Sequence, residues 1–553
     1  MIKKRFIITS LLVLSVLSLF ISVHTSAQRR AAQRAHVVIL GTTDMHGRVF
    51  PVDYYTNKYD NVGITKVATL VREARKADPD LLLVDSGDTI QGTPLEYFHN
   101  KRNNTPPDPM MLAMNALHYD SMTVGNHEYN FGLKVLEKAR GEAKFPWLSA
   151  NTYNTGTPTT HYQPYIVKDV EGVRVGVLGL TTPGIPNWEN VPNYAGLEFK
   201  ETVSEAKKWV AILRDKEKVD VVVIAMHMGI EEDLRTGQTN PSQVPNENAA
   251  LTIARQVPGV DVILMGHTHR DVPALIVNGV LLTQANRWAS HVARVDLYLE
   301  KGEAARWRVI ARSARTIPVT EKTAVDPEIS QLGQPYDKET QDWLSRTIGQ
   351  SSAAMTSQDC RFRDTAIIDL VQRVQLEAGK ADVSMAACFN PDARIPKGPV
   401  TVREIAGIYE YENTLVTLEL TGQQLKDALE YSARYFRQYQ PGKKLSELVD
   451  QRVPGYNFDM AEGVSYELDV AKPFGQRILN LKFKGQPLSP TQKLRVVTNN
   501  YRVNGGGGFT MYKNAPVVYR SSEEVRELII DWVERNKTVP IEANNNWRIV
   551  GAQ

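Results

Sequence analysis

The chain has 553 residues, which is too long for one ordinary hydrophobic core, so two large domains are expected. Hydrophobic residues make up 42% and charged residues 23%, a composition that excludes a disordered chain. The formal net charge of +3 is too close to zero to argue for a nucleic-acid polymer or an anionic membrane as a partner.

The N-terminus has the layout of a cleavable secretory signal. Three basic residues at positions 3–5 precede an apolar run that ends at Val23, and small residues stand at Thr25 and Ala27. We therefore expect a signal peptide over residues 1–27. An uncleaved anchor is the alternative, because the apolar run is nearly long enough to span a bilayer. The prediction is a secreted protein of the periplasm or cell envelope, without a stable membrane anchor.

Residues 36–316 alternate between strand-like and helix-like runs. Continuous Val, Ile and Leu runs are typical of strands that are buried on both faces. These runs are HVVILGTTD, DLLLVDSGD, SMTVGN, VRVGVLGLT, DVVVIAMHMG, DVILMGHTH and VLLTQAN. The alternation predicts a layered α/β domain.

A helical linker and a second, smaller α/β domain are expected to follow. Asp326 can cap a helix and Pro327 fits its first turn, so residues 324–347 are predicted to form the linker helix. Residues 350–550 mix strand-like runs with helix-like runs and form the second domain. This domain contains the two cysteines of the chain, Cys360 and Cys388, which lack the spacing of a zinc ribbon. They can form one disulfide or stay as two buried thiols.

Residue types that bind metals follow the strand-like runs of the first domain. The motifs are TTDMHG, DSGD, GNHE, AMHMG and GHTH, and they contain five of the 11 histidines. The residues concerned are Asp44, His46, Asp88, Asn126, His127, His227, His267 and His269. Because the carboxyl ends of the strands in an open α/β sheet converge on one crevice, we expect these side chains to lie together.

The chemistry of these residues indicates a pair of metal ions. Carboxylate, amide and imidazole ligands without a thiolate suit Mn, Zn, Fe, Ni or Co. Two ions about 3.5–4 Å apart need one shared carboxylate, and Asp88 is the natural bridge. A single histidine at a strand end is more often a structural group, but five such motifs in this order favour a metal site.

The motifs D-x-H, G-D, G-N-H-E, H and G-H-x-H resemble those of calcineurin-like metallophosphoesterases. The resemblance covers nearly the whole chain, and SANTY and NNYRVNGGGGF are similar to stretches of secreted nucleotidases with an appended nucleotide-binding domain. The resemblance implies that His127 is not a ligand but faces the substrate phosphate, where it stabilises the charge of the transition state.

The same resemblance implies a ligand set for each of two divalent ions, such as Mn, Zn or Co. The first ion would be bound by Asp44, His46, Asp88 and His269. The second ion would be bound by Asp88, Asn126, His227 and His267. No expected ligand is missing, which argues against a binding protein or adhesin that has lost catalysis.

One branch of this family acts on 2′,3′-cyclic nucleotides and 3′-nucleotides, and the chain resembles it most. The most specific shared stretch is YNFDMAEGVSYELDV at 456–470, supported by GPVTVREI and YEYENTL. The 5′-nucleotidase branch carries N-H-E-F-D, where this chain has Asn130, and its N-x-G-G-x-R stretch is absent here. An amide can hydrogen-bond the histidine ring but supplies no charge. The predicted enzyme opens cyclic nucleotides and dephosphorylates 3′-nucleotides; a 5′-nucleotidase or UDP-sugar hydrolase is the alternative.

The second domain is expected to bind the nucleotide. By resemblance, the base stacks between Tyr411 and Tyr501, although each tyrosine could instead be a core residue. The run of glycines at 505–508 would let the backbone approach a ligand closely. A sulfur-compound hydrolase shares the scaffold but, by resemblance, lacks this aromatic clamp. The expected substrate-binding residues are Tyr411, Asn413, Tyr501, Asn390 and Arg394.

Overall fold

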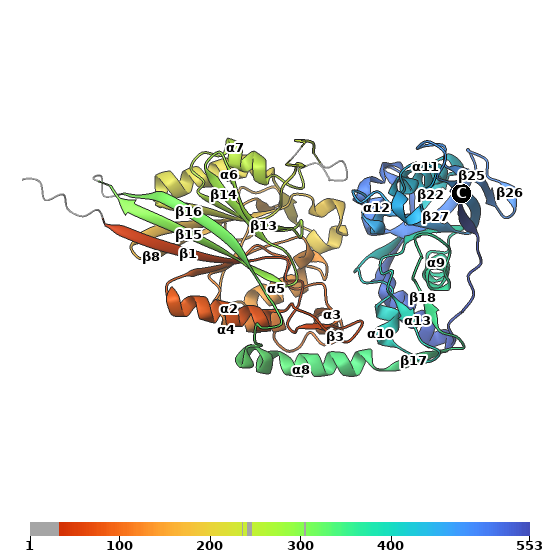
Figure 1. Cartoon of the computed structure of the whole chain (residues 1–553), viewed down its shortest axis with the longest axis horizontal. Coiled ribbons are helices and arrows are strands. Elements are labelled where there is room, and N and C mark those ends of the chain that lie inside the picture. The colour runs from red at the N-terminus through yellow and green to blue at the C-terminus, as the bar shows by residue number, and fades with distance from the viewer. Residues whose placement is uncertain (1–32, 235, 240–245, 303–305, 553) are drawn as a thin grey trace, which may run out of the picture.

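The computed structural model describes residues 33–234, 236–239, 246–302 and 306–552, so the predicted signal peptide lies outside the described part of the chain. Two lobes lie side by side, and helix α8 (Pro327–Leu344) runs along one edge of the molecule between them (Figure 1). Among the described residues, every helix is too short or too polar to cross a membrane.

The first lobe contains two six-stranded sheets rather than a single open sheet. In order across the first sheet, the strands are β16 (Trp307–Pro318), β15 (His291–Lys301), β1 (Arg34–Thr42), β4 (Leu82–Asp85), β5 (Ser121–Thr123) and β6 (Trp147–Leu148). Across the second sheet they are β13 (Asp271–Val277), β14 (Val280–Ala285), β12 (Val262–Met265), β11 (Val221–His227), β9 (Val173–Thr181) and β8 (Tyr165–Val170).

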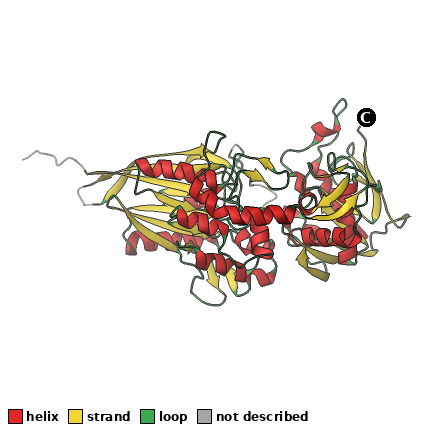
Figure 2. Ribbon diagram, turned by 90° about the horizontal axis from the view of Figure 1, so that it is seen from below, coloured by secondary structure: helices red, strands yellow, loops and turns green. Residues whose placement is uncertain are grey.

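The two sheets pack face to face, with helices on their outer faces. Val37 and Val84 of the first sheet share a buried cluster with Val177 and Val223 of the second. The helices of this lobe are α2 (Ile64–Ala77), α3 (Pro94–Lys101), α4 (Pro109–Ala116), α5 (Leu133–Glu142), α6 (Thr202–Ala211) and α7 (Ala250–Gln256). Figure 2 shows the strands enclosed between helices. The predicted layered α/β sandwich is confirmed.

The central strands of each sheet run parallel and end at the same edge. β1, β4, β5 and β6 are parallel neighbours in one sheet, and β9, β11, β12 and β14 are parallel neighbours in the other. A hydrogen bond from the Thr123 hydroxyl to the Ala225 carbonyl, 3.0 Å long, joins the sheets at this edge. The loops that follow the strands therefore meet at one place, although the strands belong to two sheets.

Helix α8 leads into the second lobe. It begins at Pro327 because the Asp326 side chain accepts a hydrogen bond from the Ile329 backbone N–H, 3.1 Å away. Ile329 and Gly333 of this helix are buried, and a Cβ on Gly333 would lie 2.9 Å from the Phe50 ring. The start of α8 is thus packed on the first lobe.

The second lobe is built on a five-stranded sheet and a four-stranded sheet. The five strands are β23 (Asp459–Glu462), β19 (Val383–Ala387), β27 (Lys493–Asn499), β22 (Thr414–Thr421) and β28 (Val517–Glu524). The four strands are β26 (Gln486–Pro487), β25 (Ile478–Phe483), β24 (Val464–Asp469) and β29 (Trp547–Val550). The helices are α9 (Ala366–Gly379), α10 (Val402–Ala406), α11 (Gly422–Ser432), α12 (Asn500–Val503) and α13 (Val525–Asn536).

The two cysteines form a disulfide. Cys360 and Cys388 are joined with their Cα atoms 6.1 Å apart, which ties the segment before α9 to the residue that follows β19. Of the two alternatives that the sequence leaves open, the structure therefore shows the disulfide.

Candidate active site

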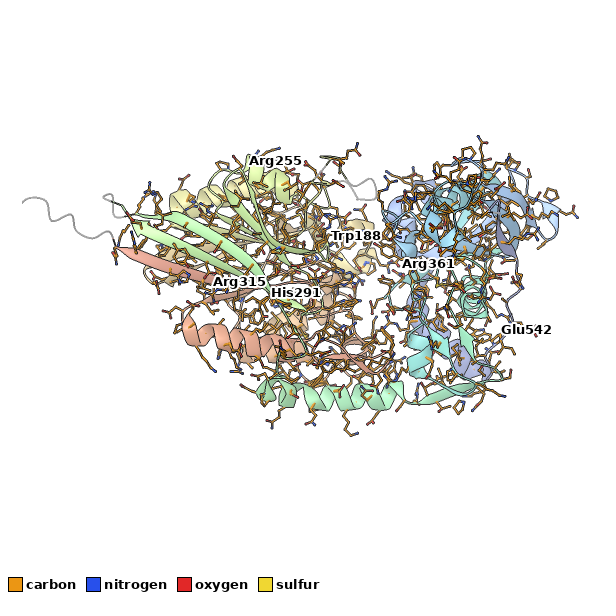
Figure 3. All side chains as sticks on the ribbon, viewed as in Figure 1. Trp188, Arg255, His291, Arg315, Arg361 and Glu542 are labelled. Carbon is orange, nitrogen blue, oxygen red and sulfur yellow. A yellow bond between two sulfur atoms is a disulfide. The ribbon has the colours of Figure 1, made fainter. Side chains whose placement is uncertain are left out.

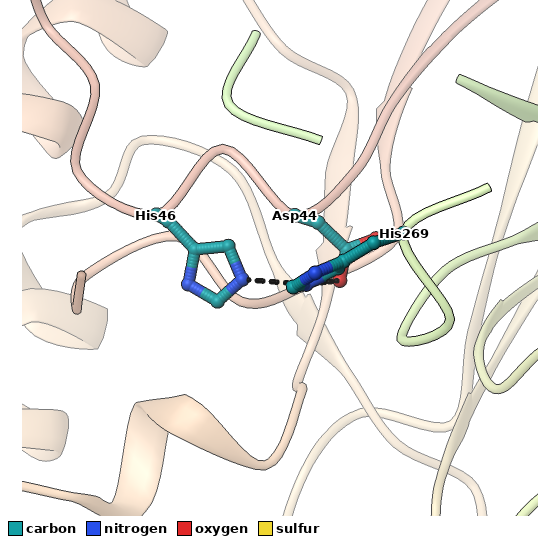
Figure 4. A group of neighbouring side chains, drawn as sticks. All are labelled: Asp44, His46 and His269. Atoms are coloured by element: carbon teal, nitrogen blue, oxygen red, sulfur yellow. Dashed lines mark hydrogen bonds and ion pairs between the residues drawn. The ribbon is translucent and has the colours of Figure 1, made fainter. Parts of the chain in front are cut away.

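Three predicted ligands form the first candidate metal group. Asp44 follows β1, and His269 follows β12 from the other sheet. Together with His46 they offer ligand atoms that all lie within 4.8 Å of one another. The Nε2 atoms of His46 and His269 are 2.9 Å apart, and Nε2 of His269 is 3.4 Å from Oδ1 of Asp44 (Figure 4). Three donor atoms thus converge on one point.

Asp88, His227 and His267 form the second candidate group, again with ligand atoms within 4.8 Å of one another. Nε2 of His227 lies 2.9 Å from Oδ2 of Asp88 and 3.1 Å from Oδ1 of Asn126. Asp88 also reaches toward the first group, since its Oδ2 is 4.0 Å from Nε2 of His46. The position of Asp88 between both groups is the one a bridging carboxylate needs.

The backbone of the candidate ligands is held in an uncommon conformation. Five of them have positive φ angles in the left-handed region, namely Asp44 (50°), His46 (49°), Asp88 (60°), His267 (70°) and His269 (53°). Non-glycine residues rarely adopt this region, and they remain there only when the surrounding structure holds them. Such strain concentrates at functional sites, so these φ angles indicate that the loops hold the five side chains in positions that serve a function.

Backbone carbonyls orient two of the histidines. Nδ1 of His46 lies 3.0 Å from the Gln91 carbonyl, and Nδ1 of His227 lies 2.8 Å from the Ser86 carbonyl. A carbonyl can only accept, so each Nδ1 carries a proton and Nε2 is the ring nitrogen left to face a metal.

His267 is oriented through its other nitrogen. Its Nε2 lies 2.8 Å from Oε1 of Glu247, which leaves Nδ1 as the ring nitrogen available to a metal. The Trp188 ring lies beside the imidazole, with ring centroids 5.4 Å apart. Sequence reasoning missed Glu247, because it stands 20 residues before His267 in a loop without a metal motif.

The electrostatics of the cluster suit divalent cations. Asp44 and Asp88 are almost fully buried, at 0% and 1% exposure, and imidazoles surround them. Burial acts to raise the pKa of Asp88, but the neighbouring His227, His127 and His46 hold its pKa well below the usual range. Burial lowers the pKa of His46 to about 3, so this ring is neutral and able to bind a metal. Buried anionic carboxylates beside imidazole nitrogens are ligands that suit two divalent metal ions.

Glu128, the last residue of GNHE, connects the loop that carries Asp88 to the loop that carries Asn126. Its buried carboxylate accepts hydrogen bonds from the backbone N–H groups of Asp88 at 3.0 Å, Thr89 at 2.6 Å and Gly125 at 2.6 Å. Position 125 requires glycine, because a Cβ there would lie 2.3 Å from Oδ1 of Asp88. The GNHE motif predicts roles for Asn126 and His127, and nothing in the sequence marks Glu128 as a residue that holds the site.

We expect Glu128→Gln to weaken metal binding by about 10–100-fold, the usual effect of losing a partner that orients a ligand. The amide NH₂ would face backbone N–H groups that need an acceptor. Metal titration of the purified variant measures the effect, with Glu198→Gln, at a side chain that is 40% exposed, as a control. Unchanged affinity in Glu128→Gln would show that the loop holds Asp88 without this carboxylate.

His127 lies at the opening of the cluster, with 32% of its side chain exposed. Its Nε2 is 4.0 Å from Oδ2 of Asp88, and its Nδ1 is 2.6 Å from Oδ1 of Asn130. The amide of Asn130 in turn donates to Oε1 of Glu189, 2.5 Å away. His127 is therefore beside the candidate metal groups, and its Nδ1 contacts the side chain of Asn130.

The second lobe presents exposed aromatic rings from its loops. Tyr411 lies in the loop before β22 and is 40% exposed, whereas Tyr409 is buried, so only Tyr411 of this pair is free to stack on a ligand. Phe389 packs edge-on against the Tyr411 ring, with centroids 5.1 Å apart. Tyr456, 39% exposed, lies 6.5 Å from Tyr411 between ring centroids and was missed by sequence reasoning.

Tyr501 lies in the short helix α12 and is half-buried. A Cβ on Gly506 would lie 2.5 Å from the Tyr501 ring, and a Cβ on Gly508 would lie 2.0 Å from the Tyr431 hydroxyl. The glycine run therefore makes room for tyrosines of the protein itself, which is a different reason for these glycines from the close approach of a ligand.

The other predicted substrate contacts lie in varied settings. The Asn413 amide donates to the Tyr409 hydroxyl at 3.3 Å. Asn390 donates to the Gly407 carbonyl at 2.8 Å and accepts from the backbone N–H of Asp392 at 2.9 Å, so it supports its own loop. Arg394 is exposed in β20 (Arg394–Ile395). Contacts of these residues with a substrate stay predictions.

Glu412, next to Tyr411, joins the loop before β22, called here the aromatic loop, to the first lobe. Its carboxylate accepts a hydrogen bond from the Gln91 amide and pairs with Arg526 at 2.9 Å. The carbonyl of the same Gln91 is bonded to His46. The loop that carries Tyr411 is therefore next to the loop that orients a candidate ligand.

The geometry agrees with comparisons to known proteins. Residues 37–271 match the model for calcineurin-like phosphoesterases, and residues 347–514 match the model for the 5′-nucleotidase C-terminal domain. A Haemophilus influenzae protein named 2′,3′-cyclic-nucleotide 2′-phosphodiesterase/3′-nucleotidase is 31% identical, covering 96% of this chain and 90% of that protein. The trifunctional nucleotide phosphoesterase protein YfkN of Bacillus subtilis is 29% identical over 99% of this chain, which spans 41% of YfkN.

A solved structure has the same two-lobed fold. It is a Staphylococcus aureus protein provisionally described as a 5′-nucleotidase, with a TM-score of 0.82 and 27% identity, covering 93% of this chain and all of that one. The shared domains, the two metal groups and the similarity over nearly the whole chain lead to one assignment. The chain is a metal-dependent phosphoesterase and belongs to the nucleotidase family of calcineurin-like phosphoesterases that carry a 5′-nucleotidase C-terminal domain.

Proposed function

We propose that this enzyme opens 2′,3′-cyclic nucleotides and then removes phosphate from the 3′-nucleotides produced. One observation carries the proposal: the exposed Tyr411 lies on a loop that Glu412 ties to Gln91, beside the two metal groups. A base stacked on Tyr411 would thus have its phosphate close to the metals. The Haemophilus influenzae relative, similar over both lobes, carries the name of this activity.

The proposed metal ligands are those that the two groups bring together. Asp44, His46, Asp88 and His269 would hold the first ion. Asp88, Asn126, His227 and His267 would hold the second. When bound, two divalent ions such as Mn, Zn or Co supply Lewis acidity at the phosphoryl oxygens and lower the pKa of water.

His127 is the proposed catalytic side chain. Its Nδ1–H is donated to Asn130, so Nε2 is directed at the opening where the phosphate would lie. Burial acts to lower the pKa of His127, but Asp88, Asn130 and the acidic Glu412 and Glu189 raise it above the ordinary value. A protonated ring can donate from Nε2 to a phosphoryl oxygen and stabilise its negative charge.

One site can perform both reactions. In the first, a water oxygen bonds to phosphorus, the bond from phosphorus to the 2′-oxygen breaks, and that oxygen takes a proton. The product is a 3′-monoester. In the second, another water bonds to the same phosphorus, and the 3′-oxygen leaves with a proton. Only the leaving oxygen differs, so the second lobe must let the ribose and base shift between the two steps.

A substrate panel tests the proposed function. We expect kcat/KM for 2′,3′-cyclic AMP and 3′-AMP to exceed the values for 5′-AMP and UDP-glucose, measured with the same Mn-loaded enzyme. The absence of the N-x-G-G-x-R stretch of the 5′-branch motivates this order. Preference for 5′-AMP would overturn the assignment and support a 5′-nucleotidase, the provisional description of the similar Staphylococcus aureus structure.

The aromatic clamp gives a separate prediction. Tyr411→Ala and Tyr501→Ala are each expected to raise KM for 2′,3′-cyclic AMP by about 5–150-fold, because stacking contributes about 1–3 kcal/mol per base. Hydrolysis of bis(p-nitrophenyl) phosphate, which lacks a base, should change little. Tyr519→Ala, at an exposed tyrosine of the same lobe, is the control. Equal losses on both substrates would mean that the two tyrosines support the fold instead.

We also propose that the enzyme works outside the cytoplasm. Two observations support this location: the signal-like layout of residues 1–27 and the disulfide between Cys360 and Cys388. Cell fractionation tests the location, and N-terminal sequencing of the mature protein tests the cleavage. A cytoplasmic protein that retains residue 1 would contradict this location.

A further inference from the structure

Glu189 is a buried carboxylate in the loop after β9 that neither the metal groups nor the aromatic loop use. It is 8% exposed. Its Oε1 accepts from the Asn130 amide at 2.5 Å, and its Oε2 accepts from the Asn193 amide at 2.8 Å. Each carboxylate oxygen thus has its own amide donor, which compensates for the loss of water around a buried charge.

We propose that Glu189 is a positioning residue that orients His127 through Asn130. The inference rests on the role of His127 in the proposed function. An ionised carboxylate can only accept hydrogen bonds, so Asn130 must turn its NH₂ group toward Glu189. The carbonyl oxygen of Asn130 then faces Nδ1 of His127, at 2.6 Å. Nδ1 must carry the proton, and Nε2 is left to face the phosphate.

The second lobe fixes the loop of Glu189 on both sides. The Trp188 carbonyl accepts from the Asn500 amide at 3.0 Å, and the Asn190 amide donates to the Thr414 hydroxyl at 3.1 Å. Figure 3 shows Trp188 on the face of the first lobe that is turned toward the second lobe. A carboxylate on a loop can therefore hold a fixed position, because the docked second lobe anchors both of its neighbours.

Two side chains follow one another from the His127 ring: the amide of Asn130 contacts the ring, and the carboxylate of Glu189 contacts that amide. The 5′-nucleotidase branch, by resemblance, has an aspartate at the position of Asn130. Here the negative charge stands one side chain further away, on Glu189. A carboxylate at position 130 with an amide at position 189 should therefore also hold the His127 ring, provided that every hydrogen-bond donor still faces an acceptor.

The test compares Glu189→Gln, Asn130→Asp and the double variant Asn130→Asp/Glu189→Gln. In Glu189→Gln an amide NH₂ must face the NH₂ of Asn130 or of Asn193, so the new side chain loses either its hydrogen bond to Asn130 or the bond to Asn193 that holds it in place. In Asn130→Asp two carboxylates would stand about 2.5 Å apart. In the double variant the new glutamine donates to the new aspartate, which still accepts from His127, and its oxygen still accepts from Asn193.

For Glu189→Gln we expect kcat on bis(p-nitrophenyl) phosphate to fall by about 10–100-fold, with little change in KM and with metal content retained. Asn130→Asp should also lose kcat, and the double variant should regain most of it. Glu198→Gln, at a half-buried glutamate of the same lobe, is the matched control. Thermal unfolding of each variant shows whether it is folded.

Three results would overturn the proposal: an unchanged kcat in Glu189→Gln, loss of bound metal in that variant, or a double variant no better than the worse single one. The aryl diester has no base and no ribose, so this outcome does not depend on which nucleotide the enzyme prefers. Failure of the substrate panel would overturn the assignment to 2′,3′-cyclic nucleotides and leave the positioning role of Glu189 in place.

Discussion

Asp88→Ala is expected to remove both metal ions and to abolish turnover. The Asp88 carboxylate lies 2.9 Å from Nε2 of His227 in one group and 4.0 Å from Nε2 of His46 in the other. Its Oδ1 also accepts from the His127 backbone N–H at 2.8 Å. Metal ions stabilise transition-state charge by several kcal/mol, so the loss should exceed about 1,000-fold in kcat/KM.

Elemental analysis of the metal-loaded proteins checks the first half of this expectation. The wild type should bind two ions per chain and Asp88→Ala fewer than one. The exposed Asp215→Ala should bind as the wild type does. A variant at position 88 that keeps two ions, or activity that survives a strong chelator in the wild type, would contradict the shared carboxylate.

His127→Ala should have the second-largest effect and a different signature. We expect kcat to fall by about 100–1,000-fold, the usual effect of removing one donor to the charge of a transition state. Bound metal should stay at two ions, because Nδ1 of the ring is held by Asn130 and Nε2 faces the opening. Loss of an ion from this variant would mean that His127 is itself a ligand.

Local patterns in the sequence were enough to predict most of the parallel strands of the first lobe and the linker helix, but not the antiparallel strands β8, β13, β15 and β16. Apolar runs end where β1, β4, β11 and β12 end, and a candidate ligand stands at the last strand residue or two to three residues after it. Asp326 before Pro327 marks the start of α8. These features depend on neighbours along the chain, which is why they could be read without a structure.

Features that depend on distant contacts could not be predicted. The sequence gives no sign that β1 and β11 belong to different sheets, because both read as buried strands. Glu189 acts on Asn130 across 59 residues and Glu247 on His267 across 20, each from a loop without a motif. A glutamate in a loop is usually solvated, and only the folded chain shows that these carboxylates bond to groups of the site.

The most direct test of the account is a ³¹P NMR time course of 2′,3′-cyclic AMP with the Mn-loaded enzyme. We expect the cyclic diester to be converted to 3′-AMP, inorganic phosphate then to appear from 3′-AMP, and a chelator to stop both steps. Accumulation of 2′-AMP, or a cyclic diester that stays intact under the same conditions, would contradict the proposed function.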